Sequence, residues 1–409
     1  MAKKEKTSEV SSLKSFIEDV LKDISKDKEV KEQIQEKEEI NTLFSGSPLL
    51  DLYLGGGIPE KRMLYIWGGE STGKSTISTQ ILSSFYKQFG ENAIYIYIDT
   101  EESFDRKRFQ QLGVNVDSPN FIVLEPITIN DIKKFLKKMY LKISTKIQNP
   151  EEYPRLFIVW DSVSSTSVDE EYYDDTNKIG PMARAISTFF RNVKFKLWNI
   201  TMITISQYRE TNIGNPYAAK EPPGGRALRH KAHITLYLTS KKASVIPDDV
   251  GREVSIFTQK SKQISPYRKI PFVYFFTTGY DSVITSIFLL MYLGEIKKSQ
   301  KYSVPWSDEK YTLDELYKYA ISGKNSYENF WLPVFNWIIS LYPEEKDYLS
   351  LEILDKIRNY YFDENGTPIL ERWTTVSASR TGNISQILNK KEESNDDEKI
   401  EIIEDDEDL

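Results

Sequence analysis

The chain has 409 residues, of which 39% are hydrophobic, and it contains no cysteine and two histidines. A chain of this length can form two or three domains with a substantial core. The missing cysteines exclude disulfides, thiolate catalysis and cysteine-bound zinc. We expect a soluble intracellular protein, because no run approaches the roughly 18 apolar residues that cross a bilayer and the charged N-terminus leads into no signal segment.

The formal net charge of −7 is unevenly distributed. Residues 392–409 hold eleven acidic residues and one lysine, a local charge of −10, so the preceding part of the chain carries +3. We predict an acidic disordered tail over residues 391–409, because its like charges repel and it has little apolar surface to bury. Such a tail either keeps the protein in solution or competes with nucleic acid for a basic groove.

The first 43 residues are rich in Lys and Glu but carry apolar residues at helical spacing. These are Leu13, Phe16, Ile17, Val20, Leu21 and Ile24. This spacing predicts an amphipathic helix in residues 1–43, outside the main domain.

A phosphate-binding pattern, G-x-x-x-x-G-K-[ST], follows in residues 68–76. Its residues are Gly68, Gly69, Glu70, Ser71, Thr72, Gly73, Lys74, Ser75 and Thr76. The apolar run Met63–Trp67 predicts a buried strand before it, and Ser75–Phe89 predicts a helix after it that ends at Gly90. We therefore expect nucleotide binding, with Lys74 on the β/γ oxygens and the Ser75 hydroxyl on Mg²⁺.

Short apolar runs then alternate with helical segments. The predicted strands are Ala93–Ile98, Phe121–Leu124, Leu156–Trp160, Ile200–Ile205 and Ile234–Leu238. This alternation predicts an α/β fold with a mostly parallel sheet over residues 44–280. Glu253–Thr258 and Phe272–Thr277 lack an intervening helix, which predicts an antiparallel extension of the sheet. Leu, Tyr and Trp at helical intervals predict a smaller, helix-rich C-terminal domain over residues 281–390.

Carboxylates follow two of the predicted strands. Asp161 ends an apolar run, the position that holds magnesium beside a phosphate-binding loop, although a strand-terminal Asp can also cap the next turn. Glu101 and Glu102 lie where open α/β sheets bind ligands, and one of them can orient an attacking water. Their chemistry alone does not distinguish the two.

The strand Ile200–Ile205 leads into Ser206-Gln207, and then into a segment rich in Asn, Gly and Pro over residues 210–225. A glutamine at this position can touch the γ-phosphate and transmit its presence to that segment. Basic and aromatic residues in and around the segment suit a groove for a nucleic-acid backbone and its bases. They are Tyr208, Arg209, Tyr217, Lys220, Arg226 and Arg229. The alternative is a solvated surface loop.

Several segments resemble the RecA family of recombinases in order and spacing, with features of its phage-encoded branch. They are Phe44–Asp51, Leu54–Pro59, Gly69–Thr76, Ile98–Asp105, Asp161–Val163, Ser206–Arg209 and Gly224–Leu228. Serine at position 206, where the family has asparagine, is a departure. The resemblance covers residues 40–295, so we transfer no function to the segment that follows.

The resemblance implies roles for individual residues. It selects Glu101 as the catalytic base, places Asp105 near the adenine, and puts Arg108 where the family stacks a tyrosine on the base. It places a first DNA-binding loop at Val168–Met182. Two basic residues there, Lys178 in the loop and Arg184 after it, are the expected DNA contacts. The pair Lys260 and Lys262, which we expect on one face of a strand, would reach the ATP of a neighbouring subunit. Without the resemblance, the two lysines read as solvated edge charges.

The implied function is ATP-dependent homologous pairing and strand exchange by a helical filament on single-stranded DNA, in recombination and DNA repair. Implied cofactors are ATP and Mg²⁺. Implied partners are homologous duplex DNA, further copies of the chain bound through the N-terminal helix, and single-strand-binding and mediator proteins, with no membrane. We expect the cytoplasm, that of a host cell if the chain is phage-encoded. The alternatives are a hexameric helicase or related motor, and a DNA-coating protein with a vestigial ATPase.

Overall fold

The computed structural model describes residues 40–169, 180–208, 226–240, 246–341 and 352–376. The chain divides into two compact units, Met1–Asn41 and Thr42–Leu409. Apart from residues 40 and 41, everything described below belongs to the second unit.

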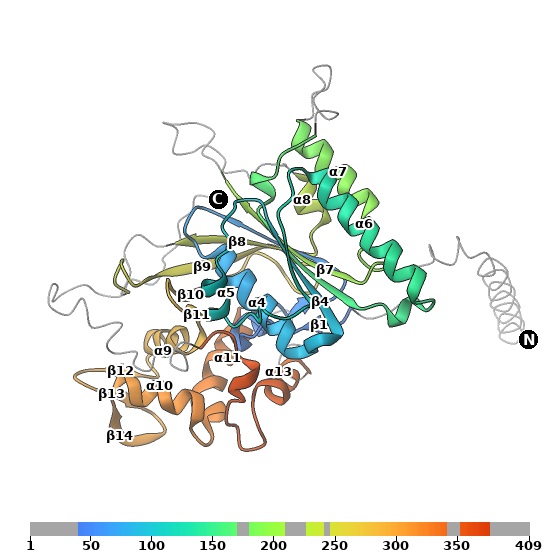
Figure 1. The fold of residues 1–409 in the computed structure, drawn as a ribbon. Helices are drawn as coiled ribbons and strands as arrows, with labels where there is room; N and C mark the ends of the chain where they lie inside the picture. The colour runs from blue at the N-terminus through green and yellow to red at the C-terminus, as the bar shows by residue number, and fades with distance from the viewer. Residues whose placement is uncertain (1–39, 170–179, 209–225, 241–245, 342–351, 377–409) are drawn as a thin grey trace, which may run out of the picture. The chain divides into compact units, whose positions relative to one another are not determined.

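A sheet of nine strands forms the centre of this unit, in the order β11-β10-β9-β8-β3-β7-β6-β4-β5 (Figure 1). The parallel strands are β3 (Met63–Gly68), β4 (Ala93–Asp99), β5 (Phe121–Leu124), β6 (Arg155–Asp161), β7 (Ile200–Gln207) and β8 (Ile234–Ser240). The antiparallel strands are β9 (Gly251–Lys260), β10 (Lys269–Phe275) and β11 (Gly279–Asp281). The predicted α/β class, mostly parallel sheet and antiparallel extension are confirmed.

Helices cover both faces of the sheet because alternate residues of each strand point to opposite sides. Leu64 and Ile66 of β3 join a cluster with α4 (Lys74–Phe89), while Met63 and Tyr65 join a second cluster on the other face. The second cluster is covered by α6 (Ile129–Lys146), α7 (Pro181–Asn192) and α8 (Arg226–Lys231). The short helices α3 (Pro48–Tyr53) and α5 (Arg106–Gln111) lie on the α4 side.

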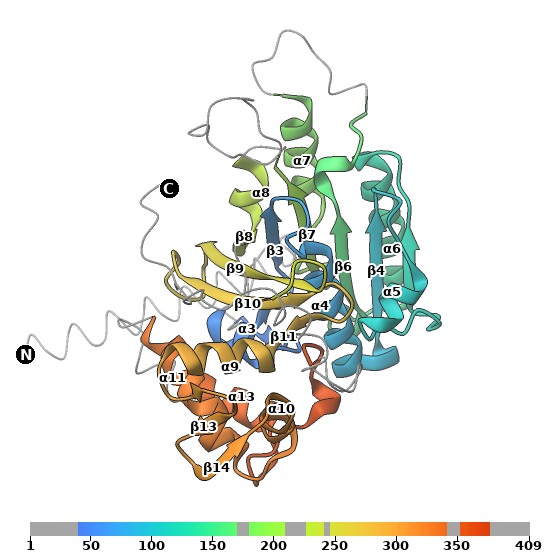
Figure 2. The same cartoon turned by 90° about the vertical axis from the view of Figure 1, so that its left-hand side faces the viewer.

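The chain after the sheet continues the first cluster, because residues 282–341 and 352–376 join the cluster that contains α3 and α4. Its helices are α9 (Ser282–Tyr292), α10 (Leu313–Ser322), the π-helix η5 (Tyr327–Trp331), α11 (Leu332–Ser340) and α13 (Leu354–Tyr361). Figure 2 shows them grouped at one end of the sheet. A small sheet that the sequence did not predict lies among them, formed by β12 (Lys297–Lys298), β13 (Tyr302–Val304) and β14 (Ser307–Tyr311).

A buried polar network joins the segment between the paired strands β1 (Thr42–Leu43) and β2 (Ile58–Pro59) to this later part. Asp51 accepts hydrogen bonds from the backbone N–H of Ser45 and from the hydroxyl of Tyr361, and it is completely buried. Burial raises the pKa of the Asp51 carboxyl to about 7. Burial therefore favours the protonated carboxyl, while the hydrogen bonds from Ser45 and Tyr361 oppose that shift.

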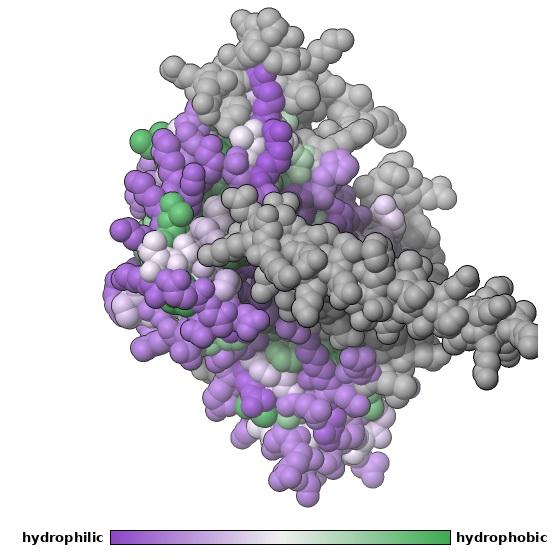
Figure 3. All heavy atoms as spheres, turned by 90° about the vertical axis from the view of Figure 1, so that its right-hand side faces the viewer, coloured by the Kyte–Doolittle hydropathy of each residue, from purple (hydrophilic) through white to green (hydrophobic). Residues whose placement is uncertain are grey.

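The surface drawn in Figure 3 is mainly hydrophilic where its atoms are described, with hydrophobic residues in separate spots. None of the described helices is long and apolar enough to span a bilayer.

Candidate active site

The phosphate-binding loop forms a turn between β3 and α4, as the sequence predicts. Gly73 has φ +75°, a conformation that L side chains rarely adopt, and it immediately precedes the first residue of α4. A hydrogen bond from β11 holds the loop, because the hydroxyl of Tyr280 donates to the carbonyl of Thr72 at 2.8 Å. The backbone N–H groups at the start of α4 therefore point into the loop, the arrangement that binds phosphate.

Lys74 lies inside this loop and is 5% exposed. Its ammonium donates to the carbonyl of Gly69 at 2.5 Å. Burial lowers the pKa of Lys74 to about 8, while the carboxylates of Asp161 and Glu101 oppose that shift. A buried ammonium is stabilised by anions, so the loop favours a phosphate group beside Lys74.

Asp161 ends β6 and is 2% exposed. The hydroxyl of Tyr97 donates to its Oδ2 at 2.6 Å, and Ser75 also hydrogen-bonds to it. Burial raises the pKa of Asp161, and these two hydrogen bonds work against that shift. A carboxylate and a hydroxyl in contact form the all-oxygen set that suits Mg²⁺, so the residues fit the predicted metal.

The structure separates the two glutamates that chemistry could not distinguish. The Glu101 carboxylate faces the site, where Ser162 Oγ donates to Oε1 at 2.5 Å and Ser165 Oγ donates to it at 2.9 Å. Glu102 is exposed and has φ +52°, which turns the backbone away after Glu101. Of the two residues, only Glu101 is held beside the end of β6.

The buried carboxylate of Asp99 holds the loop that carries Glu101. It accepts from the backbone N–H of Glu101 at 3.1 Å and from that of Phe104 at 2.7 Å. Thr100 adds a further hydrogen bond, because its hydroxyl accepts from the N–H of Ser162 at 2.9 Å. These bonds fix the loop after β4 against the turn after β6.

Gln207 ends β7 and reaches the same carboxylate. Its Nε2 lies 3.3 Å from Oε1 and 3.4 Å from Oε2 of Glu101. Its backbone N–H donates to the hydroxyl of Ser164 at 3.0 Å. The residue predicted to sense the nucleotide is therefore bonded to the predicted base.

Tyr208 follows Gln207 and packs beside the phosphate-binding loop. Its ring lies 6.2 Å from that of Trp67, centroid to centroid, and its hydroxyl bonds to Tyr237. A Cβ at Gly69 would lie 3.1 Å from the Tyr208 hydroxyl, so the glycine permits this approach. Tyr208 thus contacts the nucleotide loop from the start of the predicted DNA-binding segment.

Arg108 lies on α5, and Asp105 is the residue that immediately precedes this helix. Asp105 caps the helix by accepting from the N–H of Arg108 at 2.6 Å. The guanidinium of Arg108 bonds to the carbonyl of Thr277 and to the hydroxyl of Tyr274. The side chain is therefore tied to β10 and the turn after it.

The predicted strand does not include both lysines of the pair. β9 ends at Lys260, and the chain then turns because the hydroxyl of Ser261 accepts from the N–H groups of Gln263 and Ile264. A β-bulge opposite Thr235 precedes the turn. Lys262 therefore lies beyond the strand and is exposed.

Lys260 bonds to the C-terminal end of α8 in its own chain. Its ammonium donates to the carbonyls of Arg229 at 2.6 Å, His230 at 3.0 Å and Ala232 at 2.7 Å. A cation at this end also complements the helix dipole. Charge repulsion from Lys262 adds to burial in lowering the pKa of Lys260, so the two lysines lie in one electropositive region.

The predicted DNA contacts fall partly within the described residues. Arg184 lies in the first turn of α7, and Arg226 and Arg229 lie on α8. The two helices follow segments outside the described residues: α7 begins shortly after residues 170–179, and α8 begins directly after residues 209–225. The remaining candidates lie outside the described residues: Lys178, Arg209, Tyr217 and Lys220.

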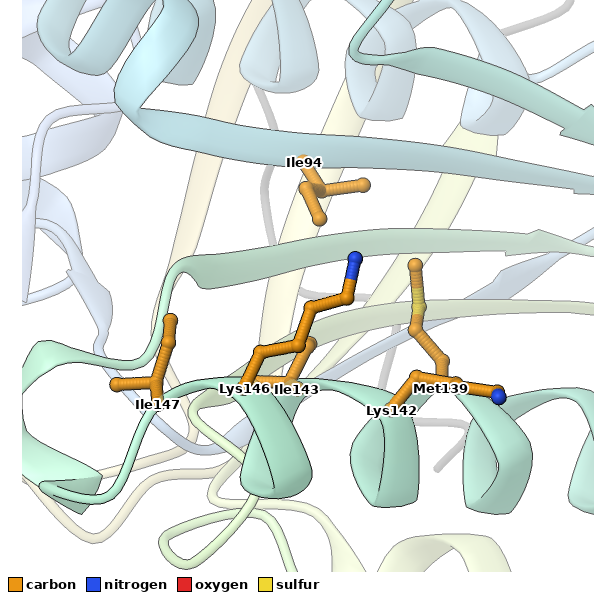
Figure 4. A pocket seen from close by; sticks show the side chains of 6 residues that line it. All are labelled: Ile94, Met139, Lys142, Ile143, Lys146 and Ile147. Atoms are coloured by element: carbon orange, nitrogen blue, oxygen red, sulfur yellow. The ribbon is translucent and has the colours of Figure 1, made fainter.

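A cavity of about 300 Å³ lies away from these residues, between β4 and the end of α6 (Figure 4). Ile94, Met139, Ile143 and Ile147 give it an apolar lining, and Lys142 and Lys146 border it. Ile94 is near the start of β4, whereas Glu101 follows its end. This cavity is therefore distinct from the phosphate-binding loop.

Sequence reasoning missed several residues that hold the site together. Tyr97, Asp99, Ser164 and Ser165 contact Asp161, Glu101 or Gln207. The sequence did hold a signal for the two serines, since Ser164 and Ser165 directly follow the segment Asp161-Ser162-Val163, which carries the predicted metal ligand. Tyr97 lies two residues before Asp99 and therefore shares its side of β4.

Comparison with known proteins gives one consistent result. The RecA N-terminal domain family matches residues 11–281. Protein RecA of Porphyromonas gingivalis is 32% identical over 273 residues, which are 64% of this chain and 74% of that protein. Protein RecA of Thermus thermophilus is 29% identical over 273 residues, covering 64% and 75%. Protein RecA of Arthrospira platensis is 27% identical over 306 residues, covering 73% and 79%.

Proposed function

Because the chain belongs to the RecA family, we propose that it is an ATP-dependent DNA recombinase. It polymerises as a helical filament on single-stranded DNA and catalyses homologous pairing and strand exchange with duplex DNA. The observation that carries this proposal is the contact between Gln207 and Glu101, at 3.3 Å and 3.4 Å. It connects the predicted base to the start of the predicted DNA-binding segment.

ATP binds with its phosphates in the loop that ends at Lys74. Ser75 and Asp161 hold Mg²⁺, whose charge compensates that of the phosphates. Arg108, tied to Thr277 and Tyr274, lies beside the nucleobase and offers a guanidinium plane in place of an aromatic ring.

Glu101 orients the water that attacks the γ-phosphate, and Lys74 stabilises the charge that develops on the transferred group. Gln207 contacts the γ-phosphate and transmits its presence to the DNA-binding segment. ATP therefore favours the state that grips DNA, and hydrolysis releases it.

The filament places each nucleotide between two subunits. Lys260 and Lys262 of one subunit reach the ATP of the next, and the amphipathic N-terminal helix docks on the neighbouring core. Support comes from the electropositive region around these lysines, which also includes Arg62 and Lys231. Their mutual repulsion favours an anion nearby.

DNA lies against the two loops that α7 and α8 border. Arg184 and Arg229 on these helices, with Arg226 and the loop residues, hold the phosphate backbone. Watson–Crick pairing supplies the sequence specificity. Single-strand-binding and mediator proteins are the expected partners, and membership of the phage-encoded branch stays a prediction.

Steady-state phosphate release, with and without single-stranded DNA, tests the proposed activity. We expect DNA to stimulate hydrolysis and Lys74→Ala to abolish it, because the phosphoryl charge then lacks its ammonium. A rate of hydrolysis that is the same with and without single-stranded DNA would contradict the proposal. Electron microscopy distinguishes the proposed recombinase from the alternative, a hexameric helicase, because the recombinase forms open filaments and the helicase forms closed rings.

A further inference from the structure

Three serine hydroxyls connect Glu101 to Gln207 through the turn η3 (Val163–Ser165). Ser162 and Ser165 donate to Glu101 Oε1, and Ser164 accepts the backbone N–H of Gln207 at 3.0 Å. The hydroxyls of Ser162 and Ser164 bond to each other at 2.9 Å, which closes the connection. One hydrogen-bonded cluster therefore holds both the carboxylate and the start of the segment after β7.

These contacts load one oxygen of the carboxylate more heavily than the other. A carboxylate has about four lone-pair sites, and here the Ser162 and Ser165 hydroxyls both bond to Oε1 while the Gln207 amide reaches both oxygens. A water held for attack needs one of these sites. At Oε2 a water competes with the Gln207 amide, which lies 3.4 Å from that oxygen.

The serines also hold Gln207 from its backbone. Gln207 has two bonds to this cluster, one from its amide to Glu101 and one from its N–H to Ser164. Ser164 thereby restrains the main chain, and Ser165 restrains the carboxylate that the amide contacts. Removing either hydroxyl weakens the arrangement without touching the phosphate-binding loop.

We propose that Ser164 and Ser165 are positioning residues that keep Glu101 and Gln207 in a resting arrangement, from which binding of single-stranded DNA releases them. This inference rests on the proposed function, since it assigns a regulatory role to the same site. It predicts that the serines suppress hydrolysis in the absence of DNA and contribute little once DNA is bound.

The test measures kcat and KM for ATP, with and without single-stranded DNA, in the double variant Ser164→Ala/Ser165→Ala. We expect the DNA-free kcat to rise about fivefold, the combined effect of losing two hydrogen bonds that each shift a two-state equilibrium by a little over twofold. The DNA-stimulated kcat and the KM for ATP should stay within about twofold of the parent. The stimulation ratio then falls about fivefold.

Two further variants separate a positioning role from a general structural one. Ser164→Thr/Ser165→Thr keeps both hydroxyls and should restore the low DNA-free rate. Ser144→Ala on α6 removes a hydroxyl that bonds to the carbonyl of Leu141, and it should change neither rate. If the double variant does not fold, Ser165→Ala alone decides, because Ser165 is exposed. Its DNA-free rate should rise about twofold.

A DNA-free rate that stays at the parent level, or that falls together with the stimulated rate, overturns this inference alone. A parent protein that DNA does not stimulate overturns the proposed function and this inference with it. The parent measurement therefore distinguishes the two failures.

Discussion

The side-chain amide of Gln207 donates to both carboxylate oxygens of Glu101, at 3.3 Å and 3.4 Å. Gln207 ends β7, whereas Glu101 lies two residues after the end of β4, and the two are 106 positions apart in sequence. β6 lies between their strands in the sheet and contributes Asp161 and the serine turn. The base, the metal ligand and the sensor of the proposed mechanism thus meet at the carboxyl ends of adjacent parallel strands, where open α/β sheets bind ligands.

Glu101→Gln should slow ATP hydrolysis by about a hundredfold or more while ATP and DNA stay bound, because an amide cannot accept the proton of the attacking water. Glu102→Gln is the matched control and should hydrolyse ATP at the parent rate, since Glu102 is exposed. Phosphate release and a DNA-binding titration measure both variants. If Glu102→Gln is the slow variant, the base is misassigned.

Lys260→Ala and Lys262→Ala should differ in stability although both weaken DNA-stimulated hydrolysis. Lys260 satisfies three carbonyls at the end of α8, so its loss should lower the free energy of unfolding by about 1–3 kcal/mol. Lys262 is exposed, and its loss should leave stability nearly unchanged. Denaturant titration of the two variants checks this, and equal effects would contradict the role of Lys260 at α8.

The double variant Lys260→Ala/Lys262→Ala should bind ATP as a monomer and lose DNA-stimulated hydrolysis and filament growth, because in the proposed mechanism both lysines act on the ATP of a neighbour. Nucleotide-binding and phosphate-release assays on one preparation measure the two properties. Full DNA-stimulated hydrolysis by this variant would exclude the action across subunits.

Asp51→Asn should reduce the pH dependence of stability between pH 4 and 7. The folded pKa of Asp51 is about 7 against an ordinary value of 3.8, so the proton is bound more tightly in the folded state. This stability is fully present below the ordinary pKa and is lost as pH rises toward 7, with a slope of about 1.4 kcal/mol per pH unit. Asparagine is neutral throughout and lacks this loss.

Denaturant unfolding of the parent and Asp51→Asn at several pH values measures the difference directly. The free energy of unfolding of the parent should fall relative to that of the variant as pH rises through this window. Parallel curves for the two proteins would show that Asp51 titrates alike in the folded and unfolded states.

Deleting the chain after Lys391 should strengthen binding to DNA, most clearly to duplex. The removed segment carries −10 and is tethered to a body that carries +3. A tether keeps the tail at high effective concentration near positive surfaces, and salt screens that attraction. Duplex affinities of the two proteins should differ at low salt and converge at high salt. Equal affinities throughout a salt titration would leave the tail a solubilising role.

The sequence predicted the sheet, the phosphate-binding loop and the strand-end positions of Asp161 and Gln207. These features depend on local periodicity and on a motif whose flanks are contiguous in sequence. It could not separate Glu101 from Glu102 on chemistry, because the difference arises from the positive φ of Glu102 and from contacts with a distant turn.

The remaining misses have similar physical causes. The bulge before Lys260 depends on pairing with β8, and the turn after it depends on the side chain of Ser261. The Asp51–Tyr361 contact joins residues 310 positions apart. β12 and β14 are short strands with exposed lysines and acids that lack a clear apolar alternation, and β13 has only three residues. No local pattern specifies contacts of this kind.

Formation of joint molecules tests the central claim most directly. The protein is mixed with ATP, Mg²⁺, circular single strands and homologous linear duplex, and the products are separated by gel electrophoresis. The account predicts joint molecules that require ATP and homology and that Lys74→Ala does not form. A protein that hydrolyses ATP in response to single-stranded DNA and coats it, yet forms no joint molecules with homologous duplex, would contradict the claim that it is a recombinase.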